Sequence, residues 1–152
     1  LNTYKNHALR GCMGFGEAKY PLWLGIAQTS RLAAFSDPRF IPVSYDELPN
    51  LVIEISILSV PKRITPDPKN ICIGRDGLIV KYPGFSGLLL PQVATEHKMD
   101  AVTFLEHTCL KAGLEKDCYK NSYVEVYSFS AEVFKELSPE GEVIKEETLS
   151  CT

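Results

Sequence analysis

The sequence predicts a mixed α/β, or α+β, fold in which a sheet of largely antiparallel strands is combined with two main helices. Three observations lead to this class. The chain has 152 residues, of which 45% are hydrophobic and 23% charged, a composition typical of a globular domain that buries a sizeable core. Residues 51–60 alternate with the period of a strand. Residues 101–112 carry apolar side chains at helical spacing between a capping aspartate and a terminating glycine.

The two helices have recognisable boundaries. Pro21 suits the first turn of a helix over residues 22–35, and Ser36, Asp37 and Pro38 end it. Its expected apolar positions are Trp23, Ile26, Ala27 and Ala34. Asp100 is a plausible N-cap of the second helix, over residues 101–112, and Gly113 terminates it. Its expected apolar stripe is Val102, Leu105, Cys109 and Ala112.

The strands are predicted from alternation and from turn residues. In the strand over 51–60, one face is predicted to be core. Residues 71–74 and 78–82 read as two strands joined at 75–77, which contains an Asp-Gly pair typical of hairpin turns.

The remaining segments complete the predicted domain. A glycine-rich loop over 83–87 leads into a short buried strand over 88–90, and a last strand is expected near 123–130. Residues 1–137 are interpreted as a single domain, and residues 138–152 as a polar, frayed tail.

Composition and motif spacing argue against several functions. The net charge is -3 and the densest basic pair is Lys62-Arg63, so a nucleic-acid surface is not favoured. No apolar stretch is long enough for a bilayer. The five cysteines are odd in number and never in C-x-x-C spacing, which favours reduced thiols in a cytoplasmic protein and predicts neither a metal site nor a cofactor.

The segment Leu9-Arg10-Gly11-Cys12-Met13-Gly14 is the leading candidate site. Glycines beside Cys12 allow a sharp turn or a close approach of a ligand, and Arg10 could lower the pKa of the thiol and make it a nucleophile. Cys12 could equally be a small buried hydrophobe in a tight turn. The sequence offers no convincing base for Cys12, and His97 and His107 are expected at the surface.

Other polar residues are weaker candidates. Glu54 lies within an apolar strand and is either on a solvated face or a buried acid or base, while Glu96 and Gln92 follow a buried strand and could line a cleft. Gly14 belongs to the candidate loop. Arg39 and Arg75 lie in loops beside aspartates, which suggests local salt bridges at least as strongly as ligand binding.

Five motifs occur in the order and spacing of one family. They are Leu9-Arg10-Gly11-Cys12-Met13-Gly14, Ala34-Phe35-Ser36-Asp37-Pro38-Arg39-Phe40, Ile73-Gly74-Arg75-Asp76-Gly77-Leu78-Ile79, Leu88-Leu89-Leu90-Pro91-Gln92-Val93 and Lys111-Ala112-Gly113-Leu114. On these motifs the chain resembles the AMMECR domain family, called AmmeMemoRadiSam system protein A in prokaryotes. The resemblance covers about residues 3–135.

The resemblance implies a larger and a smaller subdomain around a cleft that contains the Arg10-Gly11-Cys12 motif. It also implies association with Memo-type and radical-SAM-type proteins, and an N-terminal helical segment that these 152 residues lack. The biochemical activity of the family is not established, so the resemblance does not provide a reaction.

Two function hypotheses therefore remain. In the first, the chain is a cytoplasmic binding or adaptor module whose motif loop recognises a protein partner, a small molecule remaining possible. In the second, it is a small enzyme or enzyme subunit in which Cys12 is the nucleophile, Arg10 stabilises an anion, and Glu54 or Glu96 is the acid or base. The missing base for Cys12 favours the binding hypothesis.

Overall fold

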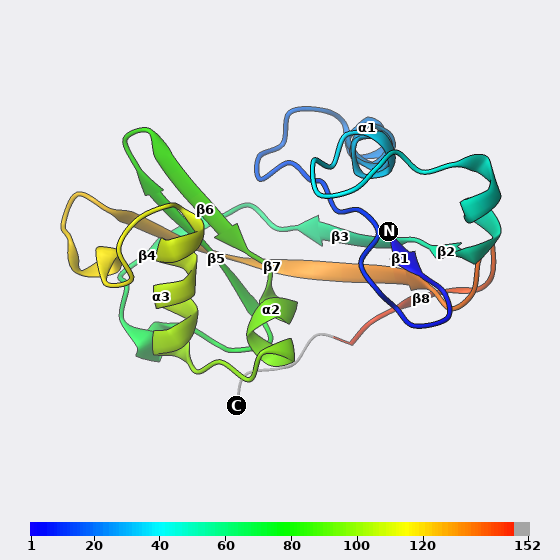
Figure 1. Cartoon of the computed structure of the whole chain (residues 1–152). Helices are drawn as coiled ribbons and strands as arrows, with labels where there is room; N and C mark the ends of the chain where they lie inside the picture. The colour runs from blue at the N-terminus through cyan, green and yellow to red at the C-terminus, as the bar shows by residue number, and fades with distance from the viewer. Residues whose placement is uncertain (148–152) are drawn as a thin grey trace. The chain divides into compact units, whose positions relative to one another are not determined.

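The computed structural model describes residues 1–147, which fold as two compact units (Figure 1). Unit 1 consists of residues 1–56 and 133–146, and unit 2 consists of residues 57–132 together with Glu147. The described elements are antiparallel strands and a few helices, so the predicted α+β class is confirmed. The two units divide the residues that the sequence assigned to one domain.

Unit 1 contains a small sheet and the first helix. Strand β1 (Asn2–Thr3) pairs antiparallel with β2 (Leu51–Val52), and both residues of β2 are buried. Helix α1 (Leu22–Phe35) is followed by the 3-10 helix η1 (Tyr45–Asn50). At the other end of the chain, β8 (Val143–Lys145) pairs with the last residues of β7 (Glu125–Glu136).

Unit 2 is built on a longer sheet covered by helices. Strand β5 (Asp76–Tyr82) pairs with β6 (Phe85–Leu89) on one side and with β7 on the other. Two further strands, β3 (Glu54–Leu58) and β4 (Lys62–Ile64), also pair with β7. Helix α3 (Ala101–Lys111) lies beside β5 and β6 (Figure 1), preceded by the short α2 (Pro91–Glu96). Two short 3-10 helices, η2 (Pro68–Asn70) and η3 (Cys118–Lys120), complete the unit.

The core of unit 2 forms where α3 meets the sheet. Its fully buried side chains include Phe104 and Leu105 of α3 and Leu78 and Val80 of β5. Gly87 on β6 permits this packing, because a Cβ there would overlap the backbone nitrogen of Ala112.

Both predicted helices are confirmed, with corrections to the faces that they bury. The first occupies 22–35, but Trp23 is 71% exposed and Ala33 is the buried residue. The second has its expected cap, since Asp100 accepts a hydrogen bond from the Thr103 amide at 2.7 Å. In its stripe, however, Val102 is exposed, whereas Phe104 and Thr108 are fully buried. The predicted burial of individual apolar residues was wrong because the face that a helix buries depends on which element packs against it.

The predicted strand over 51–60 is wrong as a continuous element. It divides at Ile53 into β2 and β3, which pair with different strands. At the break, the Ile53 amide donates to the Glu136 side chain at 2.9 Å, while its carbonyl accepts from the Glu136 amide. Leu51 and Val52 are both buried, so the expectation of one core face is also wrong. Alternation in sequence does not reveal a change of pairing partner.

The predicted hairpin over 71–82 is wrong in its first strand and its turn, whereas its second strand, 78–82, lies within β5. Residues 73–75 form a turn, which is closed by the Cys72 amide donating to the Asp76 carboxylate and by the Asp76 amide donating to the Cys72 carbonyl. The hairpin in the structure joins β5 to β6 through Pro83 and Gly84, and Gly84 has a φ of 80°. The segment interpreted as a glycine-rich loop is therefore partly strand.

The C-terminal part of the chain is more regular than predicted. Strand β7 extends from Glu125 to Glu136 rather than over 123–130. Residues 143–145, expected to fray, form β8 in register with β7, with Lys135 opposite Ile144. The rest of the predicted tail, residues 148–152, lies outside the described residues.

The expectation of reduced thiols is confirmed at Cys12 and wrong for the other described cysteines. Cys109 and Cys118 form a disulfide, and Cys72 is disulfide-bonded as well. The pairing of Cys109 with Cys118 joins the end of α3 to η3, a proximity that cysteine count and spacing do not reveal. Within the part of the chain that the structure describes, no helix combines the length and apolar character needed to span a membrane.

Candidate functional site

The candidate loop, residues 9–14, is held against α1 in unit 1. Backbone hydrogen bonds join the Arg10 amide to the Leu1 carbonyl, and Gly11 is buried. A Cβ at Gly11 would overlap the carbonyl oxygen of Ala33, so glycine permits the close approach of the loop to the helix. The loop position is therefore set by backbone packing against a regular element.

Arg10 is fully engaged in holding this part of unit 1 together. Its Nε and Nη2 donate to the two carboxylate oxygens of Glu47 at 2.7 and 3.0 Å, and its Nη1 donates to the Ile41 carbonyl at 3.0 Å. Hydrogen bonds from Arg10, and then from the Ser44 amide, lower the pKa of Glu47 from 4.5 to about 2. All three guanidinium nitrogens are thus directed at structural partners and none at the Cys12 thiol.

The backbone of Cys12 is anchored by a second ion pair. Its amide donates to Oδ2 of the buried Asp37 at 2.9 Å, and its carbonyl accepts from Arg39 Nη2 at 3.3 Å. Arg39 also grips Asp37 through Nε and Nη2, at 2.9 and 2.7 Å. Hydrogen bonds from Arg39 and then from the Cys12 amide hold the pKa of Asp37 well below its ordinary value, so the carboxylate stays charged.

Phe40 connects the two ion pairs. Arg10 and Arg39 both lie over its ring, with 5.9 and 5.5 Å from each guanidinium carbon to the ring centroid. The Arg39 side chain is nevertheless 54% exposed, whereas that of Arg10 is 12% exposed. The site therefore presents one oriented guanidinium, that of Arg39, beside Cys12.

Cys12 itself is exposed and is the free cysteine of the described residues. Among residues 1–147 its sulfur has no hydrogen-bond partner. The alternative of a small hydrophobe buried in the core is therefore wrong. An exposed thiol on a rigid loop can contact a partner surface or act as a nucleophile, and the geometry supplies no bonded base that would activate it.

Comparison with known proteins identifies the family. Residues 1–134 match AMMECR1. The chain belongs to the AMMECR1 family. Protein Ta0236 of Thermoplasma acidophilum is 51% identical over 149 residues, which are 95% of this chain and 72% of that protein. Protein MJ0810 of Methanocaldococcus jannaschii is 44% identical over 154 residues, which are 98% of this chain and 77% of that protein. The crystal structure of the uncharacterized protein PH0010 from Pyrococcus horikoshii is similar, with a TM-score of 0.92, 44% identity, and coverage of 97% of this chain and 76% of that one.

Two of the motifs by which the chain resembles the AMMECR1 family meet at this site. Arg10, Gly11 and Cys12 of one motif contact α1 and the segment containing Asp37 and Arg39 of the other. The salt bridge predicted between Arg39 and its neighbouring aspartate is confirmed.

The same arrangement recurs in unit 2. The Cys72 amide donates to Oδ2 of the buried Asp76 at 2.8 Å, and Arg75 grips that carboxylate through Nε and Nη2 at 2.7 and 2.9 Å. The salt bridge predicted for Arg75 is therefore confirmed too. The two cysteines differ in state, because Cys72 is disulfide-bonded and Cys12 is free.

None of the other predicted candidates is hydrogen-bonded to the Cys12 thiol in the described part of the chain. Glu54 is exposed at the start of β3. Gly14 is exposed too, and a Cβ added there would meet nothing within 4 Å, so packing does not require a glycine at this position. Gln92 and Glu96 belong to α2 in unit 2, as part-buried and exposed residues respectively. His97 and His107 are exposed, as predicted.

The sequence analysis did not anticipate Glu47 or the contact between Asp37 and Cys12. Asp37 was expected to end the first helix and to pair with Arg39, and Glu47 was not singled out. A signal for Glu47 was present, since Ser44 and Glu47 have the spacing of a capping box, and the Ser44 amide indeed donates to Glu47 at 2.8 Å. Across residues 1–147, no three His, Cys, Asp or Glu side chains lie close enough together to hold a metal ion.

Proposed function

We propose that this AMMECR1-family chain is a cytoplasmic binding or adaptor module that engages Memo-type or radical-SAM-type proteins through residues 9–14 and Arg39. The observation that carries the proposal is the complete engagement of Arg10 by Glu47 and Ile41. A residue expected to assist a nucleophile instead fixes the shape of the loop. A fixed loop suits recognition, because little conformational entropy is lost when it binds.

The surface of the loop has the composition of a protein interface. Leu9 and Met13 flank the motif and are 45% and 38% exposed, and Arg39 adds an oriented guanidinium. On α1 in the same unit, Leu22 and Trp23 are also largely exposed. Methionine, arginine and aromatic residues are enriched in protein interfaces, which supports a protein partner.

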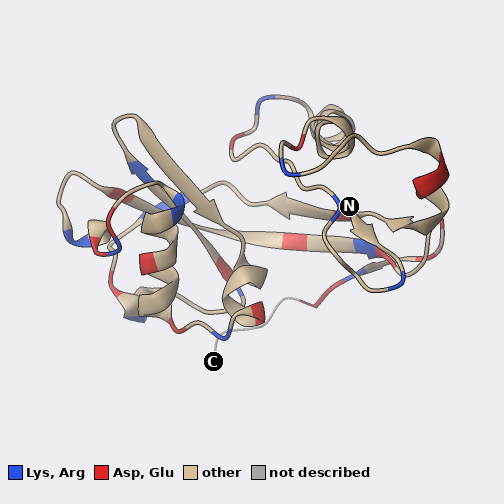
Figure 2. Ribbon diagram, viewed as in Figure 1, with Lys and Arg blue, Asp and Glu red and all other residues tan. Residues whose placement is uncertain are grey.

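The charge distribution supports the same class of partner. Figure 2 shows Lys and Arg interspersed with Asp and Glu along the elements of each unit, rather than gathered on one element. The net charge of -3 adds no attraction for phosphate groups. A nucleic-acid partner is therefore not favoured.

The disulfides are compatible with the proposed compartment under one condition. Disulfides are rare in most cytosolic proteins but occur in intracellular proteins of hyperthermophilic archaea and bacteria. A cytoplasmic location thus requires a host whose cytoplasm tolerates the Cys109–Cys118 bond.

A second function is favoured by the free, exposed thiol of Cys12. Arg39 donates to the Cys12 carbonyl and is a cation beside this residue, so an enzyme would use Arg39 in the role that the sequence assigned to Arg10. Such an enzyme would need its acid or base from a substrate or a partner, because none is bonded to the thiol among the described residues.

Binding of purified partner proteins tests the proposal. Memo-type and radical-SAM-type proteins from the same genome are titrated with the chain in a calorimeter. We expect binding to one of them, weakened about tenfold or more by Arg39→Ala, because an oriented arginine at an interface centre contributes more than about 1.4 kcal/mol. Arg63→Ala is the matched control, since Arg63 is a comparably exposed, ion-paired arginine in unit 2, and should bind as the parent does.

Two results would contradict the binding proposal. One is the absence of binding to both classes of protein at concentrations of about 100 μM, which corresponds to an affinity too weak for a specific complex. The other is equal weakening by Arg39→Ala and Arg63→Ala. A native Cys12 that is alkylated much faster than a free cysteine, with Arg39→Ala removing the acceleration, would favour the enzyme instead.

A further inference from the structure

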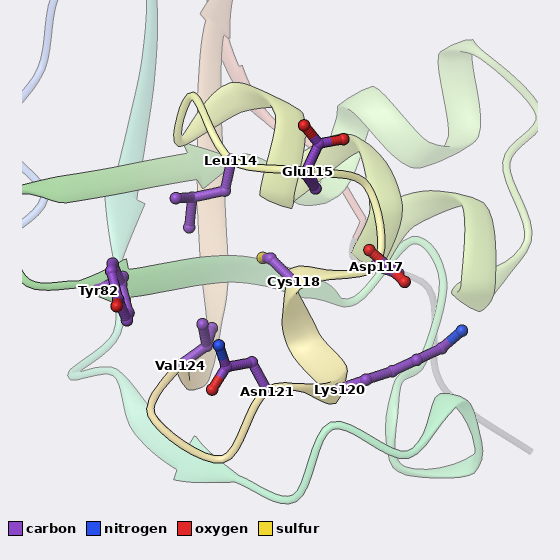
Figure 3. Close-up of a pocket in the computed structure, with 8 residues that line it drawn as sticks. All are labelled: Tyr82, Leu114, Glu115, Asp117, Cys118, Lys120, Asn121 and Val124. Atoms are coloured by element: carbon purple, nitrogen blue, oxygen red, sulfur yellow. The ribbon is translucent and has the colours of Figure 1, made fainter.

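Unit 2 contains a hollow beside Cys118. It has a volume of about 470 Å³, within the range of small-molecule sites. Its lining comes from the end of β5, the segment that follows α3, and the residue that precedes β7, as Figure 3 shows. The lining residues are Tyr82, Leu114, Glu115, Asp117, Cys118, Lys120, Asn121 and Val124.

The lining combines an apolar surface with a disulfide sulfur. Tyr82, Leu114 and Val124 supply the apolar part, and Figure 3 shows the ammonium of Lys120 extended away from them. Cys118 lines the hollow between these residues and the polar loop, and it is only partly buried. A small molecule in the hollow therefore reaches one sulfur of the Cys109–Cys118 bond.

The two sulfurs of this disulfide differ in access. Cys109 lies on α3 with no exposed surface, packed in the core with Leu105 and Phe104. Thiol–disulfide exchange requires a thiolate to approach one sulfur and expel the other. Because Cys109 is enclosed and Cys118 lines the hollow, Cys118 is the sulfur that a small thiol can attack in the folded protein.

The loop around Cys118 is held in place without the disulfide. The Cys118 amide donates to the Glu115 carbonyl at 3.0 Å, and the Asn121 amide donates to the Cys118 carbonyl at 3.0 Å. The Val124 amide in turn donates to the Asn121 carbonyl. These turns keep the wall of the hollow in place while the sulfur changes its partner.

We propose that the hollow is a thiol-exchange site at which Cys118 is reversibly modified by a low-molecular-weight thiol. The thiolate of the incoming thiol forms a bond to Cys118 Sγ, and the Cys109–Cys118 bond breaks with its electron pair going to Cys109 Sγ. The proton lost by the incoming thiol is balanced by the proton that Cys109 takes up. One thiol and one disulfide thus give one mixed disulfide and one thiol, with no other oxidant or reductant.

The mixed disulfide has two structural consequences. Its new group occupies the hollow against Tyr82, Leu114 and Val124. The bond that joins α3 to η3 is opened, while Cys109 remains in the core as a small apolar side chain. The site therefore couples the thiol content of the surroundings to the covalent link between α3 and η3.

The experiment uses 2-mercaptoethanol as the probe and the complete chain as the protein. Cys12 is first blocked with N-ethylmaleimide, the probe is added under native conditions, and the reaction is quenched with acid. Peptide mapping by mass spectrometry then locates the adduct. We expect a 2-mercaptoethanol adduct on Cys118 and a free thiol on Cys109, forming at a rate that about 1 M urea leaves unchanged, because exchange does not need global unfolding.

Filling the hollow provides the decisive comparison. Leu114→Trp places a larger side chain in the lining and should slow the adduct by about tenfold or more, since access controls the rate of exchange. Leu110→Trp is the matched control, because Leu110 is 53% exposed on α3 and does not line the hollow. Circular dichroism verifies that both variants are folded.

Three outcomes would overturn the proposal. The first is an adduct on Cys109 with a free thiol on Cys118. The second is a rate that rises steeply with urea, which means that the disulfide reacts from the unfolded chain. The third is equal slowing by Leu114→Trp and Leu110→Trp in folded proteins.

Discussion

At the scale of single residues, two buried aspartates organise the two units in the same way. Asp37 and Asp76 are 4% and 5% exposed, and each accepts hydrogen bonds from a cysteine amide and from an arginine. The planar guanidinium reaches both oxygens of the carboxylate, which the single ammonium of a lysine cannot do with the same geometry. Each aspartate thus fixes a cysteine backbone and an arginine together.

The pair between Arg10 and Glu47 predicts a specific pH dependence. Glu47 has a lowered pKa in the folded protein, so its ion pair stabilises the fold above the ordinary pKa of 4.5 and is lost as the pH falls to about 2. We expect Glu47→Gln to be less stable than the parent at pH 7. The difference in unfolding free energy should shrink as the pH is lowered from about 5 to about 2.

Urea unfolding followed by fluorescence at several pH values measures this difference. The other carboxylates titrate in both proteins, so their contributions cancel when the unfolding free energy of the variant is subtracted from that of the parent. A difference that stays constant from pH 7 to about pH 2 would show that Glu47 does not carry the charge-dependent part of the interaction.

At the scale of elements, the contact between residues 9–14 and α1 determines the shape of the candidate site. The loop approaches the helix so closely that Gly11 has no room for a side chain against Ala33. Because α1 has Ala33 as its buried residue, much of its packing depends on contacts of this kind. A change at Gly11 therefore affects both elements.

Replacing Gly11 by alanine tests this contact. The added methyl would overlap the Ala33 carbonyl oxygen, and overpacking of this kind destabilises by about 1–3 kcal/mol. Gly14→Ala is the matched control, since nothing lies within 4 Å of its added Cβ, and it should change stability by less than about 0.5 kcal/mol. Chemical denaturation measures both, and equal stability of the two variants would refute the close contact.

The features that could be predicted from the sequence are those set by local interactions. The helix over 22–35 and the cap at Asp100 depend on residues within one or two turns, and both are confirmed. Gly113, with a φ of 78°, ends α3 as its position predicted. Motif order was also sufficient to point to the family.

The features that were missed depend on partners distant in sequence. The break at Ile53 arises because β2 pairs with β1 and β3 pairs with β7, each more than 40 residues away in sequence. The alternation of residues 51–60 does not reveal this change of partner. Asp37 contacts Cys12 across 25 positions, and Arg10 contacts Glu47 across 37. Charge complementarity alone does not select such pairs, because many other carboxylates in the chain could have served.

At the scale of the whole molecule, strand β7 serves both units. Its residues 125–132 belong to unit 2, where it pairs with β4 and β5, and its residues 133–136 belong to unit 1, where it pairs with β8. The disulfide, by contrast, acts within unit 2 alone, where it closes a short loop between α3 and η3. Strand β3 is shared as well, with residues 54–56 in unit 1 and residues 57–58 in unit 2. The stability of the chain therefore depends on two shared strands and on local cross-links such as this disulfide.

Removing that disulfide should destabilise the chain measurably. Cys109 and Cys118 are separated by 9 positions, and a loop of this length stabilises by about 2–4 kcal/mol through restriction of the unfolded chain. We expect Cys118→Ala to lower the free energy of unfolding by that amount under non-reducing conditions, measured by urea denaturation. Unchanged stability, or an equal loss in the parent and the variant on adding reductant, would contradict the prediction.

The course of the chain between the units has an evolutionary consequence. Residues 57–132 leave unit 1 after Ser56 and return to it at Val133, and at that junction the Ser59 amide donates to the Ser130 carbonyl at 2.8 Å. The two ends of this segment are therefore neighbours, as they are in domains inserted into a host fold. A segment of this kind can be exchanged for that of a relative without rerouting the host chain. The sequence of unit 1, which carries the Cys12 loop, and that of unit 2, which carries the hollow, can thus change independently during evolution.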